Sequence, residues 1–189
     1  MGDPKRQRKK FDSPRFPWQM DTLEAELKIL GEYGLRNKRE IWRHKTLLSN
    51  YRGIGRSLLG QSVDERETQE KQLLGRLNRL GILHEESELD DVLDLTLEDI
   101  LDRRLQTLVY RRGLSQSMQQ ARQLIAHGHI SIDGQKVSAP SYLVLREEED
   151  KISYSPKSPL SDPDHPITRA TSIPAEPILP ETEEENKNE

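Results

Sequence analysis

The sequence contains no cysteine among its 189 residues, which excludes disulfide bonds and cysteine-ligated zinc sites. It also lacks an apolar run near the roughly 20 residues that a membrane-spanning helix needs, and its basic N-terminus lacks the apolar segment of a signal peptide. Hydrophobic residues make up 32% of the chain and aromatic residues 5%, so we expect a modest core and some disorder. These absences predict a soluble intracellular protein of one or two domains.

Charge is distributed unevenly along the chain, although the net charge is −4. Residues 1–60 carry 14 Lys and Arg against 7 Asp and Glu, whereas residues 61–110 carry 6 against 13. Residues 111–156 are nearly balanced, and residues 157–189 carry 3 cations against 8 acids. This pattern predicts a basic face that binds a polyanion and an acidic segment that faces solvent.

Residues 1–20 are predicted to be an extended basic arm. Phe11, Phe16 and Trp18 alternate with prolines and further cations. Cations suit phosphate groups and aromatic rings suit packing or base stacking, so the arm fits RNA, with a localisation signal or a generic basic tail as the alternative. The cations expected to contact RNA are Lys5, Arg6, Arg8, Lys9 and Lys10.

Residues 21–101 are predicted to form a helical domain that opens with a short amphipathic helix. Asp21 is placed to cap this helix, which is expected to end before a glycine. Its buried face is expected to consist of Leu23, Leu27 and Leu30, which follow helical spacing.

The next predicted helix combines an apolar seam with many cations. Asn37 followed by Glu40 resembles a helix start, whereas Gly53 and Gly55 are expected to break or bend the helix. Acids are scarce here, so one face should pack on the core and the other should bind phosphates. The cations expected to contact RNA are Lys38, Arg39 and Arg43.

An acidic stretch follows a third helix that starts near Asp64. Leu89, Val92 and Leu93 are predicted to be its buried points, with the charges facing solvent and away from RNA. A metal site among these carboxylates is the alternative, but the stretch lacks the spacing and glycine of an EF-hand loop. We therefore predict no metal and no cofactor.

Residues 102–154 are predicted to form an α+β module of two helices and a small β-sheet. Thr96 and Asp99 resemble a capping box for a helix that continues to Gly113, and Ser117 is placed to start a second helix. Arginines line the predicted polar face of the first helix, and glutamines with one arginine line that of the second. Such groups suit phosphates and base edges, although ordinary solvated faces are the alternative.

The β part of the module is read from alternation and turn chemistry. Ile130 and Ile132 alternate with polar residues, as in a half-buried strand, and Asp133-Gly134 is a strong hairpin turn signal. A last strand is expected over residues 151–154. Residues 155–189 are rich in proline and acids and are predicted to be a disordered tail, in which the segment SPLSDP packs locally.

Several stretches resemble one known family. The runs ARQLIAHGHISIDG and APSYLV are similar to the core of the S-four-type RNA-binding module, called the α-L fold. The arm, the run YGLRNKREIW, the run LNRLG and residues 93–113 resemble the archaeal branch of the small-subunit ribosomal protein S-four family. The resemblance covers roughly residues 3–166. Bacterial relatives often bind zinc through N-terminal cysteines, which this chain does not have.

The resemblance implies a structural protein of the small ribosomal subunit, located in the cytoplasm within the ribosome. Members bind small-subunit ribosomal RNA directly, nucleate assembly of the subunit body and influence translational accuracy. They contact neighbouring proteins, here expected from the S-five and S-twelve families, and they use no small-molecule substrate. The RNA contacts carried over to the module are Arg103, Arg104, Arg112, Ser115, Ser117, Gln119, Gln120, Arg122, Gln123, His127, His129 and Lys136.

Two other functions are compatible with an RNA-binding module. A pseudouridine synthase or a tyrosyl-tRNA synthetase would need a catalytic domain that the remaining residues cannot supply, and no P-loop, HExxH or GxSxG run is present. A free RNA chaperone that acts on stalled ribosomes is the further alternative. We therefore predict a binding protein that is not an enzyme.

Overall fold

The computed structural model describes residues 9–162 and residue 165. The predicted arm cations Lys5, Arg6 and Arg8 lie outside the described residues, as does most of the predicted C-terminal tail. No helix in the described part of the chain is long and apolar enough to cross a membrane.

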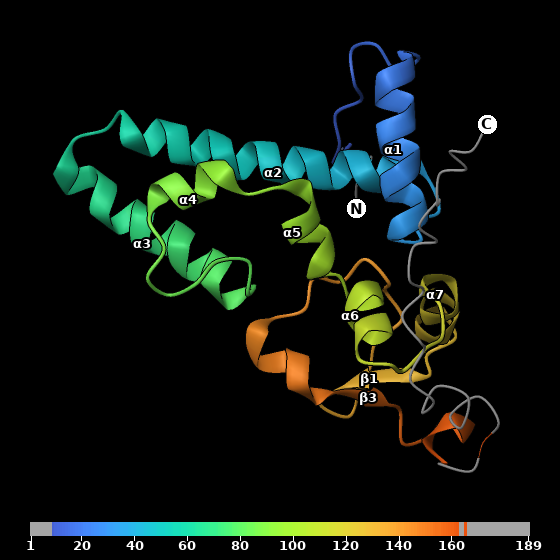
Figure 1. The fold of residues 1–189 in the computed structure, drawn as a ribbon. Coiled ribbons are helices and arrows are strands. Elements are labelled where there is room, and N and C mark those ends of the chain that lie inside the picture. The colour runs from blue at the N-terminus through green and yellow to red at the C-terminus, as the bar shows by residue number, and fades with distance from the viewer. Residues whose placement is uncertain (1–8, 163–164, 166–189) are drawn as a thin grey trace, which may run out of the picture.

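Five helices make up the N-terminal part of the described chain (Figure 1). The long helix α2 forms the spine, and α1 packs near its first turns while α3 and α4 line its other half (Figure 1). Leu48, Tyr51 and Leu58 of the spine meet Leu77 and Val92 in one buried cluster. The helices are α1 (Met20–Glu32), α2 (Lys38–Leu59), α3 (Val63–Arg79), α4 (Leu89–Asp94) and α5 (Leu97–Asp102).

One of the two predicted outcomes, that Gly53 and Gly55 break α2, is wrong, because the helix runs without interruption from Lys38 to Leu59. Gly55 is buried against α4, and an added Cβ would lie 3.4 Å from a methyl group of Leu93. The missing side chain thus allows α4 to approach the spine closely. Packing of this kind outweighs the cost of about 1 kcal/mol that glycine carries in a helix.

Helix α1 buries the face that periodicity predicts only in part, since Leu23 and Leu30 are half-buried. Leu27 is 56% exposed, whereas the neighbouring Glu26 is 2% exposed. The Glu26 carboxylate accepts hydrogen bonds from Trp42 Nε1 at 3.0 Å and Lys45 Nζ at 3.1 Å, and it lies 3.5 Å from Lys38 Nζ. Three donors on α2 therefore rotate α1 away from its apolar register.

The C-terminal part folds as two helices packed on a three-stranded antiparallel sheet of order β2-β1-β3. Its core contains Leu105, Val109, Ile125, Ile130 and Val144. This part of the chain lies below the helical part in Figure 1. The prediction of an α+β fold is confirmed. The elements are α6 (Leu105–Arg111), α7 (Met118–Ala126), β1 (Ile130–Ile132), β2 (Gln135–Lys136), the 3-10 helix η1 (Arg146–Lys151), β3 (Ile152–Tyr154) and the 3-10 helix η2 (Pro159–Ser161).

The single helix predicted from Thr96 to Gly113 is in fact two, α5 and α6. Its predicted capping box is present, since Thr96 Oγ1 accepts from Asp99 N. Between the two helices, Arg104 is extended and pairs with Leu143 in an isolated β-bridge. This distant backbone partner interrupts the helix where no local signal marks an end.

The predicted hairpin turn is confirmed, because Asp133 and Gly134 both have positive φ angles of 50° and 76°. These values match a type I′ turn, which suits the twist of paired strands. Strand β1, however, is buried along its whole length rather than on one face, and Ser131 is fully buried. It is the central strand of the sheet, between β2 and β3.

The chain beyond residue 154 continues the module as far as Asp162. Leu160 is 5% exposed and belongs to the module core, and Ser158 caps the short helix η2 through the backbone N–H of Leu160. Local packing of the SPLSDP segment, as far as it is described, agrees with the prediction.

Candidate RNA-binding surface

The described start of the arm lies along α2 and forms one wall of a groove. The Phe11 ring packs 6.0 Å from the Trp42 ring, and the backbone N–H of Asp12 donates to Thr46 Oγ1 at 3.0 Å. These contacts fix the segment onto the helical domain. The groove is lined by side chains from the arm, from α2 and from the loop after β2, among them Lys9, Lys10, Arg43, Asn50 and Ser141.

Cations dominate the part of this groove that faces solvent. Lys9, Lys10 and Arg43 are exposed, and Arg39 is exposed one helical turn before Arg43. Residues four apart lie on one side of a helix, so Arg39 extends the same basic edge. Lys38, in contrast, pairs with the buried Glu26 and is 27% exposed.

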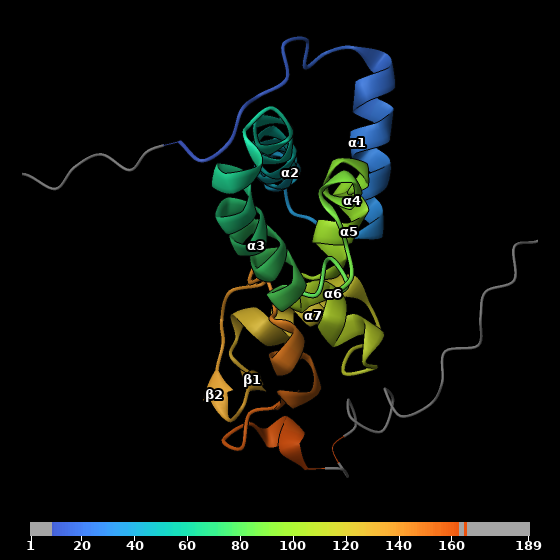
Figure 2. The same ribbon diagram turned by 90° about the vertical axis from the view of Figure 1, so that its left-hand side faces the viewer.

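The module contributes polar side chains from α7 and the hairpin. Gln119, Gln123, His127 and Lys136 are all exposed. The Lys136 side chain lies across Gly128, where an added Cβ would fall 1.7 Å from its Cε. Figure 2 shows the described start of the arm and β2 toward the left-hand side of the view.

Other residues of the module that were predicted to contact RNA make hydrogen bonds within the module itself. Ser117 Oγ accepts the N–H of Gln120 at 3.1 Å, and Gln120 Oε1 accepts the N–H of Gln116 at 2.7 Å. His129 Nδ1 lies 2.8 Å from Ser158 Oγ. The prediction that Ser115 is presented to a ligand does not fit the structure, because it is 4% exposed.

Arg103 and Arg112 form ion pairs within the protein. Arg103 Nη1 lies 2.7 Å from Glu149 Oε2, with a side chain 12% exposed. Arg112 Nη2 lies 2.8 Å from Asp150 Oδ1, and the Asp150 side chain is 98% exposed. A pair this exposed contributes little, so Arg112 stays available for phosphate while Arg103 is part of the fold.

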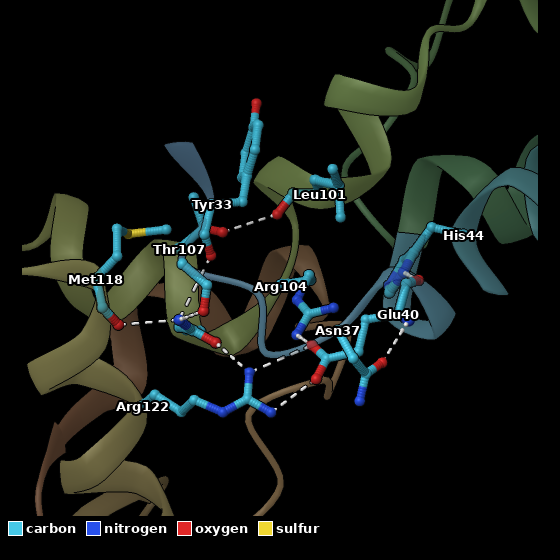
Figure 3. A network of polar contacts seen from close by, with 11 residues as sticks. Tyr33, Asn37, Glu40, His44, Leu101, Arg104, Thr107, Met118 and Arg122 are labelled. Carbon is cyan, nitrogen blue, oxygen red and sulfur yellow. Dashed lines mark hydrogen bonds and ion pairs between the residues drawn. The ribbon is translucent and has the colours of Figure 1, made fainter. Parts of the chain in front are cut away.

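Arg104 and Arg122 were predicted to lie on polar helix faces and contact RNA, but both side chains turn toward the helical domain. The Arg104 side chain is 1% exposed and the Arg122 side chain 27% exposed. Both bind one carboxylate, that of Glu40 in the first turn of α2 (Figure 3). Neither guanidinium therefore lies on an open helix face.

The contacts around Glu40 form a polar network between the helical domain and the module (Figure 3). Arg104 Nη2 lies 2.9 Å from Glu40 Oε2, and Arg122 Nη2 lies 2.7 Å from Glu40 Oε1. Gln106 is fully buried and donates to the carbonyls of Gly34 at 3.0 Å and Met118 at 2.9 Å. We call Glu40, Arg104, Gln106 and Arg122 the Glu40 network.

Burial and charge act against each other within the network. Burial raises the pKa of Glu40, but hydrogen bonds from Arg122 and the charge of Arg104 outweigh it and leave the pKa below its usual value. Burial also lowers the pKa of Arg104, and Glu40 opposes that shift. The carboxylate is thus ionised and holds two guanidinium groups at neutral pH.

His44 lies one turn further along α2 and is buried at 4% exposure. Its Nδ1 is 2.7 Å from the carbonyl of Glu40, which accepts the hydrogen bond and so fixes the proton on Nδ1. Burial lowers the pKa of His44 to about 4, so the ring is neutral near pH 7.

Sequence reasoning missed Glu40, Gln106 and Gly34 as members of this interface. Glu40 is the one acid from Arg36 to Lys45, a stretch with five Lys and Arg, and this isolation was the available signal. Gln106 carried no signal, since a glutamine on a helix is usually solvated. In the described part of the chain, no three His, Asp or Glu side chains are gathered as a metal site requires.

Comparison with known proteins gives both a domain and close relatives. Residues 103–150 match the family model described as the S4 domain. A protein of Hyperthermus butylicus is 54% identical over 159 residues, covering 84% of this chain and 90% of the relative. Relatives from Metallosphaera sedula and Methanothermobacter thermautotrophicus are 50% and 49% identical, with 86% and 85% of this chain and 91% and 94% of the relatives covered.

All three relatives carry the name small ribosomal subunit protein uS4. Their similarity spans the helical domain as well as the module, as the predicted resemblance did. Identities of about 50% over most of both chains establish a shared fold and family. The chain therefore belongs to the uS4 family of small-subunit ribosomal proteins, in its archaeal branch.

Proposed function

We propose that this protein is a structural component of the small ribosomal subunit and binds its ribosomal RNA directly. The observation that carries the proposal is the basic groove between the arm, α2 and the module, on a chain about 50% identical to uS4 proteins. Phosphate contacts supply affinity, and the shape of the folded RNA supplies most of the specificity. No bond is made or broken.

The RNA contacts that we propose are predicted residues that are exposed and hold no backbone group of the fold, together with Arg112, whose side chain is 26% exposed. They come from the arm, from the basic edge of α2 and from the module. Arg104 and Ser115 are withdrawn because they are buried, and Arg103 because it is held within the fold. The proposed contacts are Lys9, Lys10, Arg39, Arg43, Arg112, Gln119, Gln123, His127 and Lys136.

The domain division that we propose places the boundary near residue 102. Ile100 belongs to the core of the helical domain and Leu105 to that of the module. The family relationship supports cytoplasmic ribosomes as the location, and neighbours from the S-five and S-twelve families as protein partners. We propose no catalytic role and no role as a free RNA chaperone.

The test is binding of the full chain to the isolated five-prime domain of the small-subunit RNA from the same organism. An unrelated structured RNA serves as competitor at fixed salt. Tight binding that survives the competitor is expected. Binding that any structured RNA abolishes would reduce the protein to a generic basic RNA binder.

A further inference from the structure

The proposed RNA-binding surface is divided between two domains. Lys9 and Arg43 belong to the helical half, and Gln123 and Lys136 belong to the module. A folded RNA presents its phosphates at fixed positions, so both halves bind at once only if their relative orientation matches. Orientation held before binding lowers the cost of association.

We propose that Glu40 is a positioning residue that fixes the orientation of the two halves for RNA binding. The inference rests on the proposed function. Glu40 needs no contact with RNA for this role, because it acts through Arg104 and Arg122. Its carboxylate binds two arginines of the module: Arg104 contacts one oxygen and Arg122 contacts both.

The charge of Glu40 has the wrong sign for a phosphate-binding surface. Glu40 lies on the same helix as Arg39 and Arg43, its negative charge opposes their attraction for phosphate, and its side chain is 15% exposed. An acid at this position is therefore unfavourable for binding unless it contributes in another way. The two ion pairs across the domain interface provide that contribution.

The hydrogen bonds around Glu40 restrict the relative orientation of the two domains. Arg122 donates to both carboxylate oxygens of Glu40, at 2.7 and 3.2 Å, and also to Gln106 Oε1 at 3.3 Å. Gln106 in turn binds the carbonyls of Gly34 and Met118. This network thus connects the turn before α2 with the first turn of α7. The planar guanidinium of Arg122 binds both oxygens of Glu40, so it fixes the angle between the two groups as well as their distance.

The burial of Arg104 explains why the ion pair with Glu40 keeps the two domains in contact. Its side chain is 1% exposed, and its Nε and Nη1 have no hydrogen-bond partner within the described residues. Without the Glu40 carboxylate, this buried cation loses its counter-charge, which is strongly unfavourable. Separation of the domains would hydrate Arg104 and relieve that cost.

The first test is Glu40→Gln in the full chain, assayed by RNA binding at fixed salt. Removal of a negative charge beside phosphates strengthens binding if Glu40 acts by charge alone. We expect a weakening of about 3- to 30-fold instead, the range typical of residues that couple two sites. Glu24→Gln, at an exposed position on α1, removes the same charge and should leave affinity unchanged.

Arg122→Gln is the second variant, in case Glu40→Gln does not fold. We expect a similar loss of affinity with an unchanged slope of affinity against salt, and no further loss in the double variant. A slope reduced by about 0.7–0.9 would show a direct phosphate contact and overturn the role of Arg122. Additive losses would overturn the shared mechanism.

Domain orientation is measured directly with a pair of spin labels. Because the chain has no cysteine, Gln69→Cys on α3 and Gln135→Cys on β2 give one defined pair at exposed positions. A narrow distance distribution should broaden in Glu40→Gln and Arg122→Gln. Unchanged distances with unchanged or stronger binding would overturn the proposal, whereas absence of specific RNA binding by the wild-type chain would overturn the proposed function itself.

Discussion

At the scale of single residues, burial decides what each polar group contributes. His44, Glu40 and Arg104 lie close together at the domain interface, yet burial leaves the His44 ring neutral whereas Glu40 and Arg104 pair as ions. Gly34 lies at the same interface for a steric reason. Its φ angle is +55°, and an added Cβ would lie 2.8 Å from Met118 Cβ.

Stability should fall in mild acid because His44 is buried as a neutral ring. Its pKa is about 4 in the folded protein and about 6.5 when unfolded, so the unfolded chain binds the proton first. The contribution is fully present above pH 6.5 and is lost as pH falls toward 4. Denaturant unfolding at pH 7.5 and 4.5 should show that His44→Gln loses about 2 kcal/mol less than wild type. His84→Gln, at an exposed position, should behave like wild type.

Gly34→Ala should destabilise the fold by about 1–3 kcal/mol, because the left-handed backbone and the Met118 contact both oppose a Cβ. Gly31→Ala is the matched control, since Gly31 is in α1 with nothing within 4 Å of its added Cβ. That control should stabilise the protein by about 0.5–1 kcal/mol. Equal effects in thermal unfolding would contradict the assigned role of Gly34.

At the scale of elements, local signals predicted several helix starts and turns, although Asp21, predicted to cap α1, lies inside its first turn. Asn37 and Thr96 accept the backbone N–H groups that their capping positions predict, and Asp133-Gly134 forms the predicted hairpin turn. Breaks imposed from a distance were not predictable. At the split, Arg104 pairs with the distant Leu143, and Gly55 lies within an uninterrupted α2 that packs against Leu93 of α4.

The short helix η2 should contribute to module stability although it lies in a segment rich in proline. Leu160→Ala is expected to cost about 2–4 kcal/mol, because the side chain is 5% exposed within the module core. Lys157→Ala, three residues earlier at an exposed position, should have little effect. Urea unfolding of the two variants measures the difference, and a small loss in Leu160→Ala would place η2 outside the core.

At the scale of the whole molecule, sequence revealed the fold class and family but not the orientation of the domains. Cations were assigned to RNA by type, and the structure divides them into exposed ones such as Arg43 and buried ones such as Arg104. The inward position of Arg104 and Arg122 follows from Glu40, which is 64 residues from Arg104 and 82 from Arg122 in the sequence. Contacts between residues so far apart in the sequence cannot be predicted from a local sequence pattern.

RNA affinity should fall steeply with salt, because each neutralised phosphate contributes about 0.7–0.9 to the slope of log affinity against log salt. Arg43→Gln should reduce the slope by about that amount. Arg56→Gln removes the same charge from the opposite half of α2, outside the groove, and should leave the slope unchanged. A flat plot for wild type would contradict binding through phosphates.

The long separation between Glu40 and its arginines also sets an order of events during synthesis. The N-terminal helices leave the ribosome first, while the residue that completes the interface is 82 positions behind. At about 5–20 residues per second, this delay is on the order of 4 to 16 seconds. The carboxylate has neither counter-charge until Arg104 is made 64 positions later and only one until Arg122 follows, so the arrival of α7 completes the Glu40 network.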